Sequence, residues 1–190
     1  MSLSAPVFAV ALWLAFAAAQ APPAPMPPIE AARQTAPAEA GKCMWEQFPQ
    51  EARTAVLNHA TLEEVYAELA ARAQAMGNDG ITAAGRACRL SAGQFRSAGS
   101  RVADWVGRVW AEKQLAGRLG AVRLDQTFKG MAAADKLALR KAFATQGAIH
   151  QSPAKEAFDR YLAGLGIRRE EADAFAAAAA YLITRLNAEE

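Results

Sequence analysis

The sequence predicts an all-α protein, and three of its features favour that class. Apolar residues recur at spacings of three and four through most of the chain after residue 43. No stretch alternates between apolar and polar residues as a half-buried strand does. Glycine, proline, serine and threonine stand where these apolar repeats begin and end. We therefore expect residues 43–190 to form one compact bundle of about five to seven helices.

The composition fits a folded domain with a real core. Hydrophobic residues make up 53% of the 190 residues and charged residues 21%, which argues against disorder over most of the length. The net charge of +2 is small, so no overall field draws the chain toward nucleic acid. A single domain is the expected organisation.

The N-terminal residues 1–19 are predicted to be a signal peptide. Residues 7–19 form an uncharged apolar run, and Ala17 and Ala19 supply the small side chains that favour cleavage after Ala19. At this length the run is shorter than the roughly 20 residues that span a bilayer. The first six residues lack Lys and Arg, so a retained membrane anchor or a buried apolar helix stays as the alternative. Residues 20–42, rich in Pro and Ala, are expected to form a flexible leader.

The first helices of the domain have clear boundary signals. Pro49 suits the first position of a helix that runs to about residue 58. Thr61 and Glu64 match a capping box, which opens a helix that Gly77 and the following residues end. A shorter helix is expected over residues 81–89, and Ser91 with Gln94 forms a second capping-box pattern.

The helix expected over residues 95–110 is the centre of the predicted bundle. Phe95, Trp105 and Trp110 fall on one stripe of this helix and bring a large buriable area. Lys113 falls on the same side, so the buried stripe is expected to end near Trp110. The tryptophans are expected in the core, with a groove or a partner-helix contact as the alternative.

The remaining segments predict further helices. Asp125 is expected to cap a short helix, and Leu137 belongs to the apolar side of the next one. Ser152 and Pro153 are typical of a helix start, and Gly164 and Gly166 of its end. A last helix is expected from near residue 169 to residue 186.

The two cysteines, Cys43 and Cys88, predict one disulfide in an exported chain. Two buried free thiols are the alternative if the N-terminus is not a signal peptide. The predicted location is periplasmic or secreted. An excess of arginine over lysine, 15 to 6, is typical of a bacterium with a GC-rich genome.

No catalytic or metal-binding motif is present in the sequence. The chain has no Gly-x-Ser-x-Gly and no phosphate-binding glycine loop, and no cofactor is expected. His59 and His150 are fewer than the three or four ligands of a zinc site, so no metal is expected. A small cell-envelope hydrolase with a catalytic carboxylate is the alternative function. Its candidate acids are three glutamates near Tyr66, for which surface ion pairing is the ordinary explanation: Glu63, Glu64 and Glu68.

The charge is unevenly spread, and this suggests a binding surface. Residues 20–85 carry a net charge of −4, residues 86–123 a net charge of +6, and the remainder none. Four arginines of the basic block share the polar side of the aromatic helix in projection: Arg96, Arg101, Arg108 and Arg118. Asp104 is placed to neutralise one of them.

We expect a non-enzymatic binding or interaction module that uses this basic face outside the cytoplasm. Its partner would be an anionic envelope component or an acidic protein, and not nucleic acid. The alternative is that the acidic first section packs beside the basic block and cancels its charge within the fold.

Overall fold

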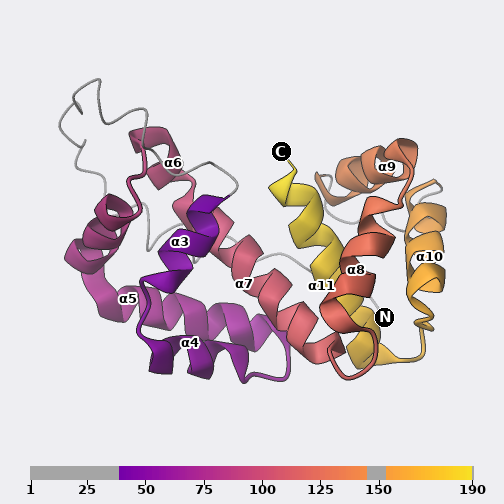
Figure 1. The fold of residues 1–190 in the computed structure, drawn as a ribbon, viewed down its shortest axis with the longest axis horizontal. Helices are drawn as coiled ribbons and strands as arrows, with labels where there is room; N and C mark the ends of the chain where they lie inside the picture. Colours follow the sequence, from indigo (N-terminus) through magenta and orange to yellow (C-terminus); the bar gives the residue numbers. More distant parts are fainter. Residues whose placement is uncertain (1–38, 145–152, 190) are drawn as a thin grey trace. The chain divides into compact units, whose positions relative to one another are not determined.

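The structure is a computed structural model that describes residues 39–144 and 153–189, and within these ranges the regular elements are helices without a strand (Figure 1). The predicted all-α class is confirmed. Nine helices are formed in the described ranges, more than the five to seven expected, because two short segments form helices of their own. The predicted signal peptide, residues 20–38 of the predicted leader and His150 lie outside the described residues.

The helices divide into two units, described here as residues 39–106 and 107–189. The first unit holds α3 (Ala40–Glu46), α4 (Gln50–Leu57), α5 (Leu62–Ala87), α6 (Ala92–Arg96) and the first half of α7 (Ala98–Leu115). The second unit holds the rest of α7 with α8 (Gly120–Lys129), α9 (Ala133–Ala144), α10 (Ala154–Leu165) and α11 (Ala172–Ala188).

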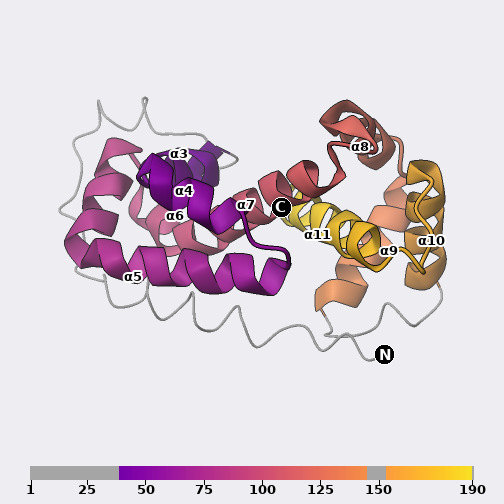
Figure 2. The ribbon, with the colours of Figure 1, turned by 90° about the horizontal axis from the view of Figure 1, so that it is seen from below.

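In the first unit, α4 lies along the first half of α5 (Figure 2). Both helices contribute small and branched apolar side chains to the core, among them Val56 and Val65, which are fully buried. The predicted capping box at the start of α5 is present. The Thr61 N–H donates to the Glu64 carboxylate at 3.1 Å, and the Glu64 N–H donates to the Thr61 hydroxyl at 3.3 Å.

A kink interrupts α5 at Gly77, where the sequence predicts the helix to stop. Gly77 has φ 65° and ψ 175°, a backbone conformation that favours glycine. Helical structure resumes directly after this residue rather than at Ile81. The predicted helices 61–77 and 81–89 are therefore the two halves of one bent element.

The prediction of one continuous aromatic helix over residues 95–110 is wrong, because the helix breaks at Ser97. The capping box of Ser91 and Gln94 opens α6, which ends at Arg96, and α7 begins at Ala98. The Ser97 hydroxyl donates to the Gln94 carbonyl at 3.2 Å. A serine that bonds to a preceding carbonyl competes with the helical ladder, and this accounts for the break.

Beyond the break, α7 buries a longer stripe than the sequence suggests. The buried residues continue from Ala98 through Trp110 to Leu115, which is only 1% exposed. The expected end of the stripe near Trp110 is wrong, because Lys113 is exposed on another side of the helix. Trp110 is a core residue as predicted, whereas Trp105 is half-buried, with Lys42 Nζ 5.8 Å from the centre of its ring.

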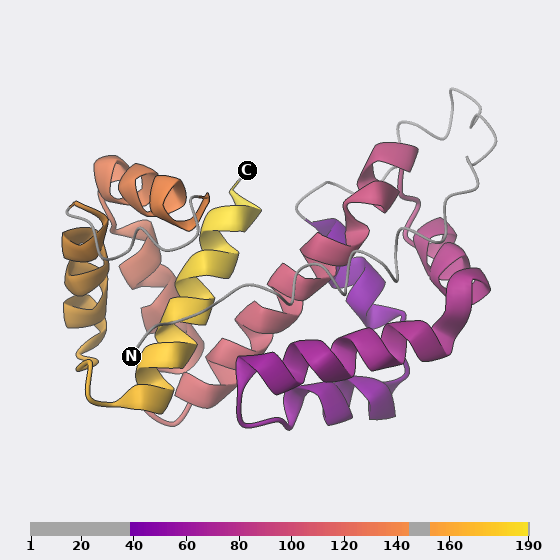
Figure 3. The same ribbon diagram turned by 180° about the vertical axis from the view of Figure 1, so that it is seen from behind.

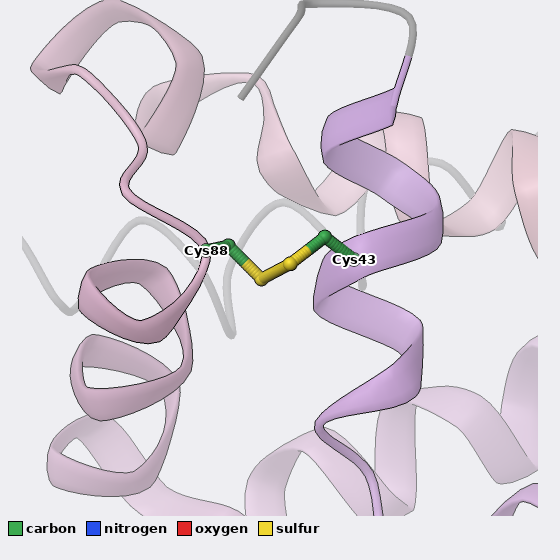
Figure 4. The surroundings of a disulfide bond; sticks show 2 residues. All are labelled: Cys43 and Cys88. Atoms are coloured by element: carbon green, nitrogen blue, oxygen red, sulfur yellow. A yellow bond between two sulfur atoms is a disulfide. The ribbon is translucent and has the colours of Figure 1, made fainter. Parts of the chain in front are cut away.

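The predicted disulfide between Cys43 and Cys88 is present and joins α3 to the end of α5 (Figure 4). The two Cα atoms are 5.8 Å apart, and Cys88 is buried. α3 also packs closely on α7, because a Cβ at Gly41 would lie 2.2 Å from the Arg101 carbonyl oxygen. The bridge therefore holds the C-terminal turn of α5 at a fixed place in the first unit.

In the second unit, α10 packs on α8 and α9 (Figure 3). Phe128 is fully buried, with Lys136 Nζ 4.1 Å and the Arg185 guanidinium 4.9 Å from its ring centre. Two predictions fail here. Asp125 lies inside α8 rather than at its cap, and it bonds to Arg185 at 3.0 Å. Leu137 is 53% exposed, because the buried side of α9 contains Leu139 instead.

Candidate binding surface

The arginines of the second unit are bonded within that unit. Each one that the structure describes makes an ion pair with a carboxylate or donates to a backbone carbonyl. Arg160, for example, donates two hydrogen bonds to Asp135, at 2.6 and 3.1 Å. This contact holds the pKa of the Asp135 carboxyl below its ordinary value. The guanidinium groups of these arginines therefore already have partners within the second unit.

Two arginines of the predicted basic face belong to this bonded group. Arg108 pairs with Glu112, one turn further along α7, at 3.0 Å. Arg118 pairs with Glu171 and donates to the Gly166 carbonyl at 2.7 Å. Charge cancellation is thus present for these two, but the carboxylates come from α7 and the start of α11 rather than from the acidic first section.

The other two arginines of the predicted face lie in the first unit and differ from each other. Arg101 is half-buried, and its Nε donates to the Ser97 hydroxyl at 3.3 Å. Arg96 is exposed at the end of α6, and its side chain makes no ion pair or hydrogen bond with the described part of the chain. Asp104 lies near Tyr66, whose pKa is raised by burial and by the Asp104 charge.

The structure adds two exposed arginines, Arg86 and Arg89, to the candidate surface. Like Arg96, neither makes an ion pair or hydrogen bond through its side chain with any described residue. Arg86 lies in the last turn of α5, where a positive charge interacts well with the helix dipole. Such a dipole interaction does not use the N–H donors of the guanidinium.

Packing between the ends of α5 and α6 brings these arginines into one region of the first unit. A Cβ at Gly85 would lie 2.5 Å from the Phe95 ring, so the two residues are in direct contact. Arg86 and Arg96 are the chain neighbours of this contacting pair, and Arg89 follows Arg86 by three residues. We call Arg86, Arg89 and Arg96 the arginine surface.

Arg89 has an unusual backbone conformation. Its φ of 51° is the only positive value at a non-glycine residue in the described ranges. The Arg89 N–H donates to the Arg86 carbonyl at 2.9 Å, and the next N–H, of Leu90, donates to the Gly85 carbonyl at 3.1 Å. These two bonds form the Schellman motif, whose left-handed residue is most often glycine.

Sequence reasoning placed Arg86 and Arg89 in the basic block but not on the candidate face. The helical projection was centred on residues 95–118, and these two residues precede it. A usable signal was present: the segment from Gly80 to Ala103 contains no Asp or Glu. Arg86, Arg89 and Arg96 therefore have no carboxylate three or four residues away in sequence to pair with.

The carboxylates considered for catalysis have structural partners or are exposed. Glu64 belongs to the capping box, and hydrogen bonds from Thr61 hold its pKa below the ordinary value. A general acid needs a raised pKa instead. Glu68 pairs with Arg72 at 2.6 Å, and Glu63 is exposed.

Within the described ranges, no group of three or more His, Cys, Asp or Glu side chains is arranged to hold a metal ion. His59 is half-buried just after the end of α4. The helices of the described part of the chain are also too short or too polar to cross a membrane.

Comparison of the chain with protein-family models, with curated proteins and with solved structures finds no significant match.

Proposed function

We propose that the protein is an exported, non-enzymatic binding module of the bacterial envelope, periplasmic or secreted, that docks an anionic partner through the arginine surface. The observation that carries this proposal is the contrast between the two units. The arginines of the second unit are bonded, whereas Arg86, Arg89 and Arg96 are exposed and make no ion pair within the described residues. Exposed guanidinium groups are suited to carboxylate and phosphate groups of a partner.

Export is supported by two independent observations. The Cys43–Cys88 bridge is one of them, because disulfides persist in oxidising compartments and are rare in the cytosol. The N-terminal residues 1–19 have the apolar run and small residues of a cleavable signal peptide. The alternative function, a hydrolase with a catalytic carboxylate, has no observation in its favour, and the lowered pKa of Glu64 opposes it for that residue.

The test is co-sedimentation of the purified protein with cell-wall sacculi and with anionic vesicles, at low and at raised salt. The variant R86Q/R89Q/R96Q removes the arginine surface. Its matched control is R160Q/R168Q/R169Q, which removes the same number of arginines from ion pairs of the second unit. We expect wild type and control to bind and the first variant not to bind, with binding weakened by salt. Equal binding by both triple variants, or release of soluble wall fragments, would contradict the proposal.

A further inference from the structure

The stretch from Gly80 to Ala103, which carries the three arginines, contains no acidic side chain. Between Gly80 and Ala103 the exposed residues are alanine, glycine, serine and arginine only. This stretch therefore offers positive charge beside small side chains. A dense, flat array of negative groups fits it better than a partner with mixed charges.

Two polar side chains of this stretch that could recognise a shaped ligand, Ser91 and Gln94, are already used within the fold. Ser91 and Gln94 bond to each other's backbone N–H groups in the capping box, at 3.3 and 2.8 Å. Specific sites for small ligands depend on a few precisely placed polar groups of this kind. Within the segment, the arginines are therefore the principal groups offered to a ligand.

The stretch from Gly80 to Ala103 offers a single aromatic side chain. Phe95, the one aromatic residue between Gly80 and Ala103, packs on Gly85. Protein interfaces usually depend on buried aromatic anchors. An acidic protein partner is therefore a poorer fit than a surface that needs only charge.

Arg89 supplies a further reason to expect a functional contact. A left-handed conformation is unfavourable for a residue with a Cβ, and such residues are over-represented at functional sites. The neighbouring Cys88 is bonded to α3, so the turn that presents Arg89 is held in place.

We infer that the arginine surface docks on the phosphate headgroups of an anionic phospholipid bilayer, with Arg89 as a principal contact. This inference rests on the proposed function and names its partner. Each arginine near an anionic membrane surface strengthens binding by about five-fold, so loss of all three should weaken it on the order of 100-fold.

The experiment measures binding of the full chain, purified after export under non-reducing conditions, to phosphatidylcholine vesicles with and without phosphatidylglycerol. Wild type, R86Q/R89Q/R96Q and the control R160Q/R168Q/R169Q are compared, since they share the same N-terminus. R89K keeps the charge and R89G removes it without unfolding the turn. Sodium phosphate and sodium chloride are then compared as competitors at equal ionic strength.

We expect binding that requires phosphatidylglycerol, is kept by the control and by R89K, and is reduced about five-fold by R89G. Both salts should compete equally. Binding to sacculi but not to vesicles would overturn this inference and leave the proposed function standing. Binding to neither would overturn both. Equal vesicle binding by the two triple variants, or displacement by phosphate far beyond that by chloride, would also overturn the bilayer assignment.

Discussion

Replacing Arg89 with glycine should stabilise the protein, although it removes a large side chain. The end of α10 provides an internal comparison. There the Gly166 N–H donates to the Ala163 carbonyl and the Ile167 N–H to the Leu162 carbonyl, both at 3.0 Å. This is the hydrogen-bond pattern found at the end of α5, with glycine (φ 69°) in the place of Arg89. α5 therefore uses a less favourable residue in the same motif.

The size of the effect follows from two opposing contributions. A left-handed conformation costs a residue with a Cβ about 1–2 kcal/mol. Glycine offsets about 0.5–1 kcal/mol of this gain, because it increases the conformational entropy of the unfolded chain. Arg89 is exposed and its side chain has no described partner, so little else is lost. R89G should raise the free energy of unfolding by about 0.5–1 kcal/mol.

The assay is urea unfolding under non-reducing conditions, with R86G as the matched control. Arg86 is the same residue type three positions earlier, but it lies inside α5 in the last turn. Glycine in a helix costs up to about 1 kcal/mol, so R86G should lower the midpoint while R89G raises it. If both variants are destabilised to a similar extent, the account of the Arg89 conformation is wrong.

Three further predictions concern the fold. G41A should lower the free energy of unfolding by at least about 2 kcal/mol in the urea assay, because the added Cβ would lie 2.2 Å from the Arg101 carbonyl oxygen. G117A is the control and should be nearly neutral, since no atom lies within 4 Å of the Cβ that it adds. C43A/C88A should lose about 4 kcal/mol in the chain-entropy model, since the bridge spans 45 residues; an unchanged urea midpoint would contradict this. Burial raises the pKa of all three tyrosines, Tyr66, Tyr161 and Tyr181, so their contribution to stability should not change with pH below about pH 10 and should be lost above it. Tyrosinate absorbance should then appear only with unfolding, and gradual ionisation near pH 10 in a folded chain would refute this.

The elements that sequence reasoning predicted well depend on local chemistry. The capping boxes of Thr61 and Ser91 form because the interacting groups are three residues apart and need no tertiary contact. The disulfide was predictable because only two cysteines exist to pair. Gly77 breaks the helical backbone for a reason that is also local.

The failures depend on contacts between segments distant in sequence or on competition within a turn. The break at Ser97 reflects a side-chain bond that competes with the backbone ladder, which periodicity does not reveal. Arg118 is not available on the candidate face, because Glu171, 53 residues later, pairs with it. Helical projection cannot indicate such a partner.

Arg89 was missed for a related reason. A helix end without glycine gives no sequence signal that its residue is left-handed. The motif became visible only from the bonds of Arg89 and Leu90 to the preceding turn.

The central claim is that the exposed arginines serve a partner rather than the fold. The most direct test measures the unfolding free energy and the binding to phosphatidylglycerol vesicles of one variant, R86Q/R89G/R96Q, in the same preparation beside wild type. The account predicts stability equal to or above that of wild type, together with binding lost on the order of 100-fold. Reduced stability with unchanged binding would contradict it, because the arginines would then belong to the fold.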